Sequence, residues 1–534
     1  MTYDIIIKDG RVIDGTGNPL FKGDVGITDS EITGLGKLDQ GDAAELIDAK
    51  GLVVAPGFVD VHTHNKLTLL ISPEAHKVFM GVTTEIVGTC GVSAAPVRSD
   101  RFEELKVAFC TVGGGYGFFI KDPGVPWDWE SFDDFMRRME SLSFSVNVGS
   151  YVGHMNLRAA TSGLFGSEAS DDEIEAMKDL LDESMRAGAF GLSTALSYVH
   201  ATTEEITELC NIVGKHGGHY AQHPRDRTLG STVQGIEIAE KAGVPLQLSH
   251  HFQKEGWEHD LKTIDDARDR GVDVTMDHWM VPYGGAGGAI NRLPGWAREG
   301  GQERVLQRLR NPETRSRIKA ELSGIPESRW RGTVLRGVDS EENERYLHMS
   351  FLEIAAERGV DPFDAMFDMY LESGGVMEID GSPTFIDDRP PELHPEMVRY
   401  LRSPLMMVAS DSMLESNTPF MPDPRAYGVF PGVLQYYVRE RGYLTLENAV
   451  RKMTSLPAQR MGLWDRGLIG RGMKADIVIF DAERVESMSV PGYPEKANRT
   501  AKGIEYVLVN GAVTVERGRH TGALAGEVLR NGSQ

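Results

Sequence analysis

The chain has 534 residues, of which 40% are hydrophobic and 25% are charged, a composition typical of a globular protein with a large core. Its formal net charge of -23 argues against nucleic acid or an anionic membrane as the main partner, because polyanions would be repelled. Three cysteines do not form a disulfide framework in so long a chain, and the N-terminal segment has neither a signal-peptide pattern nor an anchor. We therefore expect a cytoplasmic protein that does not bind membranes.

Short strand patterns separated by turn residues fill the two ends of the chain. Residues 1 to about 55 read as a meander that is too small to bury a face of its own. The C-terminal part repeats this pattern at residues 476–480 and 506–509, and Asn510-Gly511 after them is a strong hairpin signal. We expect residues 1–55 and 468–534 to combine into one small β-sandwich domain.

The central part, residues 56–467, alternates strand-like and helix-like segments, the pattern of an α/β fold with a parallel sheet. A capping box at residues 170–173 predicts the start of one helix, and Thr202 predicts the start of another. Eight strands are predicted, at residues 51–61, 82–87, 144–151, 189–194, 219–223, 245–249, 272–276 and 405–409. Eight such strands predict a (β/α)8 barrel. Residues 284–343 are expected to form an insertion or lid over its mouth.

Metal-competent residues lie where the predicted strands end. His62 and His64 follow the first strand, and side chains two residues apart point to the same side of a strand, so both imidazoles can face one ion. The others are Cys90, His223, His250 and Asp411, after the second, fifth, sixth and eighth strands. Each alone could be an ordinary core residue. Together, at the strand ends where such barrels carry their active sites, they predict a metal centre.

Several motifs resemble a known family. Residues 56–64, Pro-Gly-Phe-Val-Asp-Val-His-Thr-His, together with the late Asp411, resemble the amidohydrolase superfamily. Gly-Val-Thr-Thr at 81–84, Gly-Thr-Cys-Gly-Val-Ser at 88–93 and Ser-His-His at 249–251 resemble its N-acyl-D-amino-acid deacylase (D-aminoacylase) branch. The resemblance runs nearly end to end. It implies a barrel with a β-sandwich made of both termini, and a hydrolase that cleaves the C–N bond of an N-acyl-D-amino acid or a similar small-molecule amide.

The resemblance also implies a zinc site. Cys90, His223 and His250 would hold zinc tightly, with the thiolate in place of the modified lysine of other branches. His62, His64 and Asp411 would line a second, weaker position. The number of bound ions, one or two, therefore stays open. A thiolate and two imidazoles leave zinc an open position for water, whose pKa then falls to roughly 7. Asp411 would take the proton of that water and deliver it to the leaving nitrogen.

Three further residues are candidates for substrate binding. Tyr198 and Tyr283 match tyrosines that line the pocket in this branch and could donate to the developing oxyanion. A loop aromatic that covers the barrel mouth is an equally good interpretation of each. Arg425, soon after Asp411, could hold a substrate carboxylate with two parallel hydrogen bonds. The alternative is that Arg425 pairs with Asp423 or Asp411 and only shapes its loop.

The chain departs from the branch near these residues. Asn65-Lys66 stands where an acidic residue is usual, Phe252 replaces a lysine, and Asp423 replaces the histidine of a His-Pro-Arg triplet. Retained ligands with altered pocket charges indicate the same chemistry on a different substrate. A cyclic amide, a carbamate or another non-amino-acid amide is therefore the second hypothesis. A catalytically silent scaffold is the third, although it predicts lost ligands. The sequence leaves the oligomeric state open, a homo-oligomer included.

Overall fold

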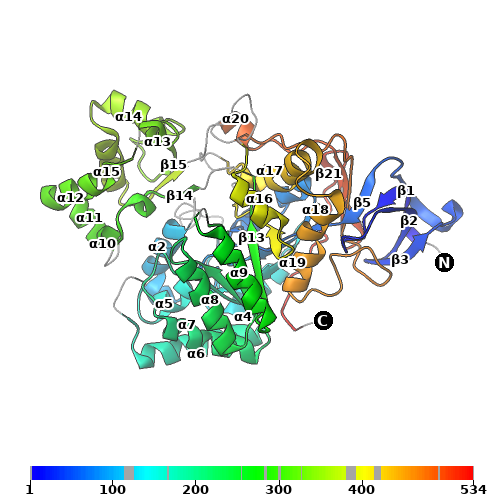
Figure 1. Cartoon of the computed structure of the whole chain (residues 1–534), viewed down its shortest axis with the longest axis horizontal. Helices are drawn as coiled ribbons and strands as arrows, with labels where there is room; N and C mark the ends of the chain where they lie inside the picture. The colour runs from blue at the N-terminus through cyan, green and yellow to red at the C-terminus, as the bar shows by residue number, and fades with distance from the viewer. Residues whose placement is uncertain are drawn as a thin grey trace.

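The computed structural model describes residues 3–112, 125–164, 168–253, 255–281, 286–298, 302–325, 327–380, 392–413, 422–490 and 494–532. A central barrel lies between a β domain, which carries the N-terminus, and a separate helical unit (Figure 1). No helix in these ranges is both long enough and apolar enough to cross a membrane.

Eight parallel strand positions form the barrel. In chain order they are β6 (Phe58–Asp60), β7 (Val82–Val87), β8 (Asn147–Ser150) continued by β9 (Val152–Gly153), β10 (Gly191–Ala195), β11 (His219–His223), β12 (Leu246–Leu248), β13 (Val274–His278) and β17 (Met406–Val408). The barrel closes between β17 and β6, where Asp411 N–H donates to the His62 carbonyl (2.8 Å) and His64 N–H donates to the Ser412 carbonyl (2.9 Å). The predicted (β/α)8 barrel is confirmed.

The first predicted strand, 51–61, is divided in the structure. Residues Val53–Pro56 form β5, which pairs with β1 and β18 of the terminal sheet, and only Phe58–Asp60 (β6) enters the barrel. Gly57 separates them: its N–H donates to the Asp476 carbonyl (2.8 Å), and a Cβ there would lie 2.2 Å from Thr83 Oγ1. The chain therefore passes from the β domain into the barrel at a position that only glycine can occupy.

Amphipathic helices cover the barrel strands. The box at Ser170 opens α6 (Asp171–Arg186), and the Thr202 hydroxyl caps α7 (Thr203–Lys215), as predicted. Further helices are α1 (Thr68–Ile71), α2 (Phe102–Val112), α4 (Phe132–Glu140), α5 (His154–Ala160), α8 (Leu229–Ala242), α9 (Trp257–Asp269), α16 (Pro395–Arg402), α17 (Arg425–Gly432) with the π-helical Val433–Glu440, α18 (Leu446–Met453), α19 (Ser455–Arg460) and α20 (Pro494–Ala497). Their buried faces and the strands share one large apolar core.

Both termini build the β domain. Its strands are β1 (Tyr3–Val12), β2 (Phe21–Thr28), β3 (Glu31–Gly36), β4 (Ala43–Asp48), β5, β18 (Ile477–Phe480), β19 (Ile504–Val509), β20 (Ala512–Glu516) and β21 (Arg519–His520). The first half of β1 pairs with β4 and its second half with β5. β18 pairs with β5, which joins the two ends of the chain in one sheet. The sheet surrounds an apolar cluster that includes Ile7, Ile477 and Leu508.

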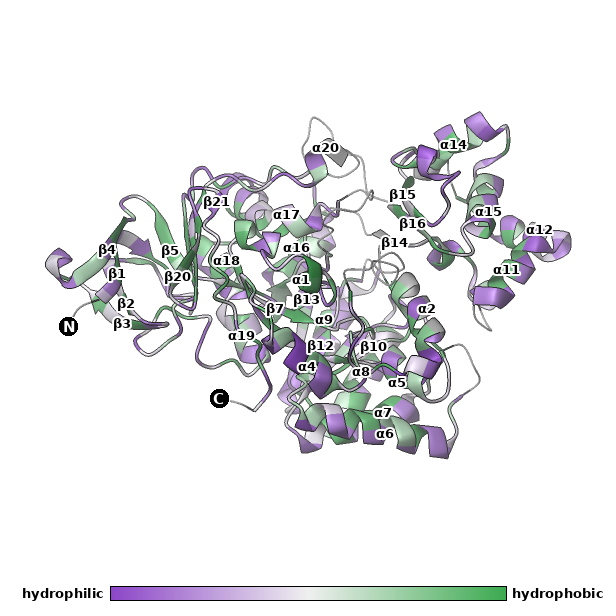
Figure 2. Cartoon of the chain, turned by 180° about the vertical axis from the view of Figure 1, so that it is seen from behind, coloured by the Kyte–Doolittle hydropathy of each residue, from purple (hydrophilic) through white to green (hydrophobic). Residues whose placement is uncertain are grey.

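A separate unit is inserted between β13 and β17. It contains β14 (Ala286–Gly288), β15 (Val334–Val338), β16 (Met377–Asp380), α10 (Gly295–Arg298), α11 (Gln302–Arg310), α12 (Pro312–Leu322), α13 (Glu327–Arg331), α14 (Phe351–Arg358) and α15 (Pro362–Glu372). Its helices carry both hydrophobic and hydrophilic residues (Figure 2), as one-sided burial requires. Its own core includes Trp330, Phe351 and Phe367. The unit therefore extends past the predicted end at residue 343, because α14 and α15 supply much of that core.

Candidate metal centre and active site

Residues from four barrel strands meet at one point. His62 follows β6, Cys90 follows β7, His250 follows β12 and Asp411 follows β17, and one ligand atom from each lies within 4.8 Å of the others. All four residues are buried. The carboxyl ends of the strands, where barrel enzymes carry their active sites, thus bring these side chains together.

The sulfur of Cys90 is surrounded by imidazole nitrogens. Nε2 of His62, Nε2 of His250 and Nδ1 of His223 lie 3.2, 3.3 and 3.4 Å from Sγ. The thiol proton can go to one of these nitrogens, and the sulfur is only a weak acceptor for N–H groups of the other two. Nδ1 of His64 and Nδ1 of His250 are also buried without a hydrogen-bond partner in the described ranges. A thiol crowded by basic nitrogens fits residues that hold a divalent metal ion.

Three of these residues have strained backbones. Cys90, His250 and Asp411 have φ values of 51°, 37° and 48°, in the left-handed region that side chains other than glycine rarely occupy. The strain costs on the order of 1–3 kcal/mol per residue and persists only where surrounding contacts hold it. For Asp411 such a contact is the backbone hydrogen bond to His62. All three residues lie in turns that follow barrel strands, and strain at such positions is typical of functional sites.

Asp277, at the end of β13, was missed by the sequence analysis. Its carboxylate lies 2.9 Å from His62 Nδ1 and accepts hydrogen bonds from His250 N–H (3.0 Å) and Gln247 Nε2 (2.6 Å). The carboxylate can hold a proton on Nδ1 of His62, so that Nε2, which lies near Cys90, is the nitrogen available to a metal ion. The predicted seventh strand stopped at residue 276; the acidic residue immediately after it was the available signal.

A second buried network lies beneath the histidines. Lys77 Nζ donates to Asp60 Oδ2 (2.9 Å), to Ser410 Oγ (2.8 Å) and to the hydroxyl of Thr63. Asp60 and Ser410 come from β6 and the end of β17, so the ammonium group ties together the two strands at which the barrel closes. All four side chains are fully buried. The network holds the turns that carry His62, His64 and Asp411.

The departure at Asn65-Lys66 has a structural explanation. Asn65 Nδ2 donates to Glu85 Oε2 (2.7 Å), and burial raises the pKa of Glu85. An acidic side chain at position 65 would place a second carboxyl beside that one. Lys66 lies over the ring of Phe109 (5.4 Å to the centroid), and burial lowers its pKa to about 7.

Asp411 is held as a carboxylate. Its Oδ1 lies 3.0 Å from His64 Nε2 and 3.2 Å from His62 Nε2, and its Oδ2 accepts from Arg425 Nη1 (2.9 Å). Burial alone would raise the pKa of Asp411, but the Arg425 guanidinium and His62 hold it well below its usual range. Arg425 also donates from Nε and Nη2 to both oxygens of Asp423. The pairing of Arg425 with both aspartates is the alternative that the sequence left open.

A cavity of about 150 Å³ opens onto this centre. Its lining includes five predicted site residues besides His64 and Asp411: Cys90, Tyr198, His223, His250 and Arg425. The ring of Tyr198 lies 5.0 Å from that of His223. Arg336, from β15 of the inserted unit, completes one wall. Tyr283 lies outside the described residues, and Phe252 packs against Tyr400 with ring centroids 5.7 Å apart.

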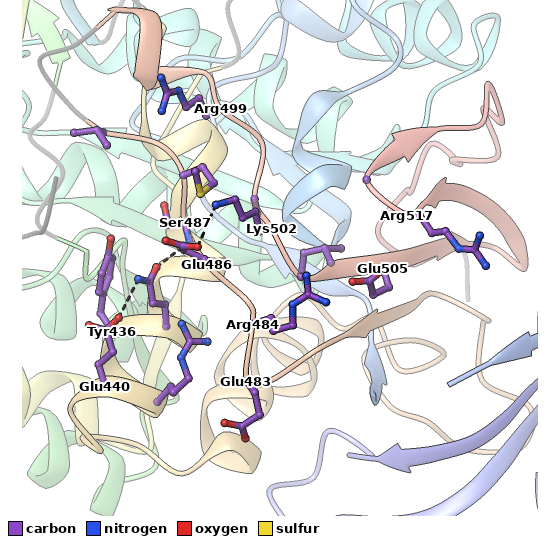
Figure 3. A pocket seen from close by; sticks show the side chains of 18 residues that line it. Tyr436, Glu440, Glu483, Arg484, Glu486, Ser487, Arg499, Lys502, Glu505 and Arg517 are labelled. Carbon is purple, nitrogen blue, oxygen red and sulfur yellow. Dashed lines mark hydrogen bonds and ion pairs between the residues drawn. The ribbon is translucent and has the colours of Figure 1, made fainter. Parts of the chain in front are cut away.

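A larger cavity, of about 720 Å³, lies elsewhere (Figure 3). Charged side chains of both signs surround it, among them Arg484, Glu486, Lys502 and Arg517. Glu486 pairs with Lys502 (3.5 Å). None of the predicted site residues lines this cavity.

The model of the Amidohydrolase family matches residues 45–282 and 388–515, and the unmatched stretch contains the inserted unit. The chain belongs to the amidohydrolase family. The protein is therefore a metal-dependent hydrolase of amide carbon–nitrogen bonds, and the resemblance inferred from its motifs is confirmed.

Relatives of known activity match over nearly the whole length. The D-aminoacylase of Alcaligenes xylosoxydans xylosoxydans is 33% identical over 538 residues, which cover 99% of this chain and 97% of the relative. The N-acyl-D-aspartate deacylase of the same organism is 31% identical, covering 99% and 95%. The crystal structure of N-acyl-D-glutamate deacylase from Bordetella bronchiseptica, with zinc and a phosphonate mimic of the tetrahedral intermediate, has a TM-score of 0.78 at 27% identity, covering 99% and 100%.

Proposed function

We propose that this amidohydrolase uses zinc to hydrolyse the amide bond of N-acyl-D-amino acids. The observation that carries the proposal is the buried cluster of His62, Cys90, His250 and Asp411 at the mouth of the barrel. The substrates named for its relatives, which are D-amino acids with an acyl group on nitrogen, support the substrate class.

Cys90, His223 and His250 would hold zinc tightly, because thiolate and imidazole suit this borderline-soft ion better than carboxylate does. His62, His64 and Asp411 would line a second, weaker position. Nε2 of His250 and Nδ1 of His223 lie 3.3 and 3.4 Å from Cys90 Sγ, which supports an ion shared by these three residues. A bound zinc ion supplies Lewis acidity that activates water and polarises the amide carbonyl.

Asp411 would carry the proton during hydrolysis. Its low pKa keeps it ionised, and it lines the cavity in which the amide would sit. It accepts a proton as water adds to the carbonyl carbon, and returns the proton to the nitrogen as the C–N bond breaks. The products are a carboxylate and an amine. Arg425 holds Oδ2 and thereby orients Oδ1 toward His64.

Tyr198 would donate a hydrogen bond to the amide oxygen as negative charge develops there. Burial raises the pKa of Tyr198, so its phenol keeps the proton that it must donate. Tyr283 is proposed for the same task. Binding of a substrate carboxylate by Arg425 remains a prediction, and the ion pairs to Asp411 and Asp423 support the competing interpretation.

The test is a hydrolysis screen of the zinc-loaded protein. It should contain both enantiomers of N-acetyl amino acids with neutral and acidic side chains, a cyclic amide and a carbamate. We expect release of the free amine from D-enantiomers, and loss of that release in Cys90→Ala. Hydrolysis of the cyclic amide or the carbamate, with no N-acetyl amino acid accepted, would refute the proposal and favour the second hypothesis.

A further inference from the structure

Three arginines line the active-site cavity, but they differ in the carboxylates with which they form ion pairs. Arg336 donates to Glu378 (3.0 Å), and Arg425 is paired with Asp411 and Asp423 (2.9 Å each). Within the described residues, no ion pair joins Arg227 to a carboxylate. Its Nη1 donates to the carbonyl of His250 (3.0 Å), which fixes the guanidinium beside a candidate metal ligand.

Arg227 is available to a ligand. It lies on the loop between β11 and α8, four residues after His223, and its side chain is exposed where it lines the cavity. A guanidinium that lines the cavity and has no ion-paired carboxylate within the described residues can take a bound anion as its partner.

A second guanidinium, that of Arg298, lies near the same side of the cavity as Arg227. Arg298, at the end of α10 in the inserted unit, donates from Nη1 to the Ser197 carbonyl (3.4 Å). Its Nε is buried without a hydrogen-bond partner in the described part of the chain. Tyr198 follows Ser197 in the chain and lines the same cavity as Arg227. Arg298 and Arg227 therefore both lie on the side of the cavity that carries Tyr198.

We propose that Arg227, assisted by Arg298, binds the α-carboxylate of the substrate, and that Arg425 does not. This inference rests on the proposed function. A protein of net charge -23 repels an anionic substrate overall, so the carboxylate must meet a local cation. The planar guanidinium of Arg227 offers two parallel donors to a carboxylate. All three nitrogens of Arg425 are instead bonded to buried aspartates, and a substrate would have to displace these pairs.

The experiment compares two substrates of the same shape. One is the N-acetyl-D-amino acid with an uncharged side chain that the wild type hydrolyses best, and the other is the same compound with its carboxylate converted to a carboxamide. For Arg227→Gln we expect kcat/KM on the carboxylate substrate to fall roughly 10- to 100-fold, mainly through KM. The loss on the carboxamide should be under about threefold. Arg298→Gln should show the same selectivity with a smaller loss.

Arg225→Gln is the matched control, because Arg225 lies on the same loop and donates to the Ala201 carbonyl; its kinetics should be unchanged. Metal content and melting temperature of Arg227→Gln should equal those of the wild type. Equal losses on both substrates, or no loss on either, would overturn the inference. Failure of the proposed function is distinguishable, because the wild type itself would then hydrolyse no N-acetyl amino acid.

Discussion

At the scale of single residues, the side chains at the strand ends supply the candidate metal ligands of this protein. Cys90 is buried among three imidazoles, whereas Cys210 is buried in the apolar face of α7. Both thiols are buried, but their neighbours differ. The neighbours support the proposal that Cys90, and not Cys210, serves as a metal ligand.

Replacement of Cys90 tests that assignment. Cys90→Ala removes the one soft ligand of the cluster, so we expect most of the zinc to be lost on elemental analysis of the purified protein. Cys210→Ala is the matched control and should keep its metal. Full metal content in Cys90→Ala would contradict the ligand assignment.

Replacement of Asp411 separates metal binding from proton transfer. Asp411→Asn keeps the shape of the side chain but cannot accept a proton from water, so kcat should fall on the order of 10²-fold or more. Zinc bound by Cys90, His223 and His250 should largely remain. A folded Asp411→Asn protein with near-normal kcat would exclude the proposed role.

Sequence reasoning located most of the candidate site at this scale. Strand ends could be predicted because apolar runs stop at polar residues, and the candidate ligands follow those stops. Asp277 was missed because the seventh strand was predicted to end at residue 276, although β13 runs to His278. Arg227 was missed because its contact with the His250 carbonyl cannot be read from sequence spacing. The ion pairs of Arg425 could be named only as an alternative, since spacing does not decide which partner a side chain meets.

At the scale of elements, the strands that close the barrel depend on buried polar networks. β6, β7 and β17 are linked by Lys77, Asp60, Ser410 and the contact of Asn65 with Glu85. Apolar packing alone would not set the positions of the turns that carry the ligands. A substitution that changes the charge of one of these buried side chains should therefore disturb the network as much as one that changes its size.

Asn65→Asp tests this constraint. It would place two buried carboxyls in contact, so we expect the metal-free protein to lose roughly 1–3 kcal/mol of stability at neutral pH in urea unfolding. Burial already raises the folded-state pKa of Glu85, so protonation favours the folded state. The loss should therefore grow as the pH rises above the ordinary glutamate pKa and shrink as it falls. Adding Glu85→Gln should restore stability; a double variant as unstable as Asn65→Asp would contradict the explanation.

Element boundaries were less predictable than element identities. The helices α6 and α7 began at their predicted caps, because capping is a local interaction. The division of residues 51–61 at Gly57 depends on pairing with β18, more than 400 residues away in sequence. The inserted unit was underestimated because α14 and α15 have the same one-sided pattern as helices that cover a barrel.

At the scale of the whole molecule, the metal centre joins distant parts of the chain. Its candidate ligands come from the ends of β6, β7, β11, β12 and β17, which lie on both sides of the barrel closure. The inserted unit adds Arg336 to the cavity. An ion held at this point should therefore stabilise the entire barrel rather than one loop.

Removal of the metal measures how much a bound ion stabilises the folded protein. An ion that binds only the folded protein stabilises it by RT ln(1 + [L]/Kd), about 4 kcal/mol at a free concentration of 1,000 Kd. We expect the chelator-treated protein to melt at least several degrees below the zinc-loaded one in calorimetry, and zinc to restore the difference. Cys90→Ala should melt at the same temperature with and without chelator, because its tight site is already lost. Identical melting temperatures for wild-type protein with verified full and zero metal content would mean that the ion does not bind the folded protein in preference to the unfolded chain. That result would contradict the proposal that the imidazoles around Cys90 share an ion with its sulfur.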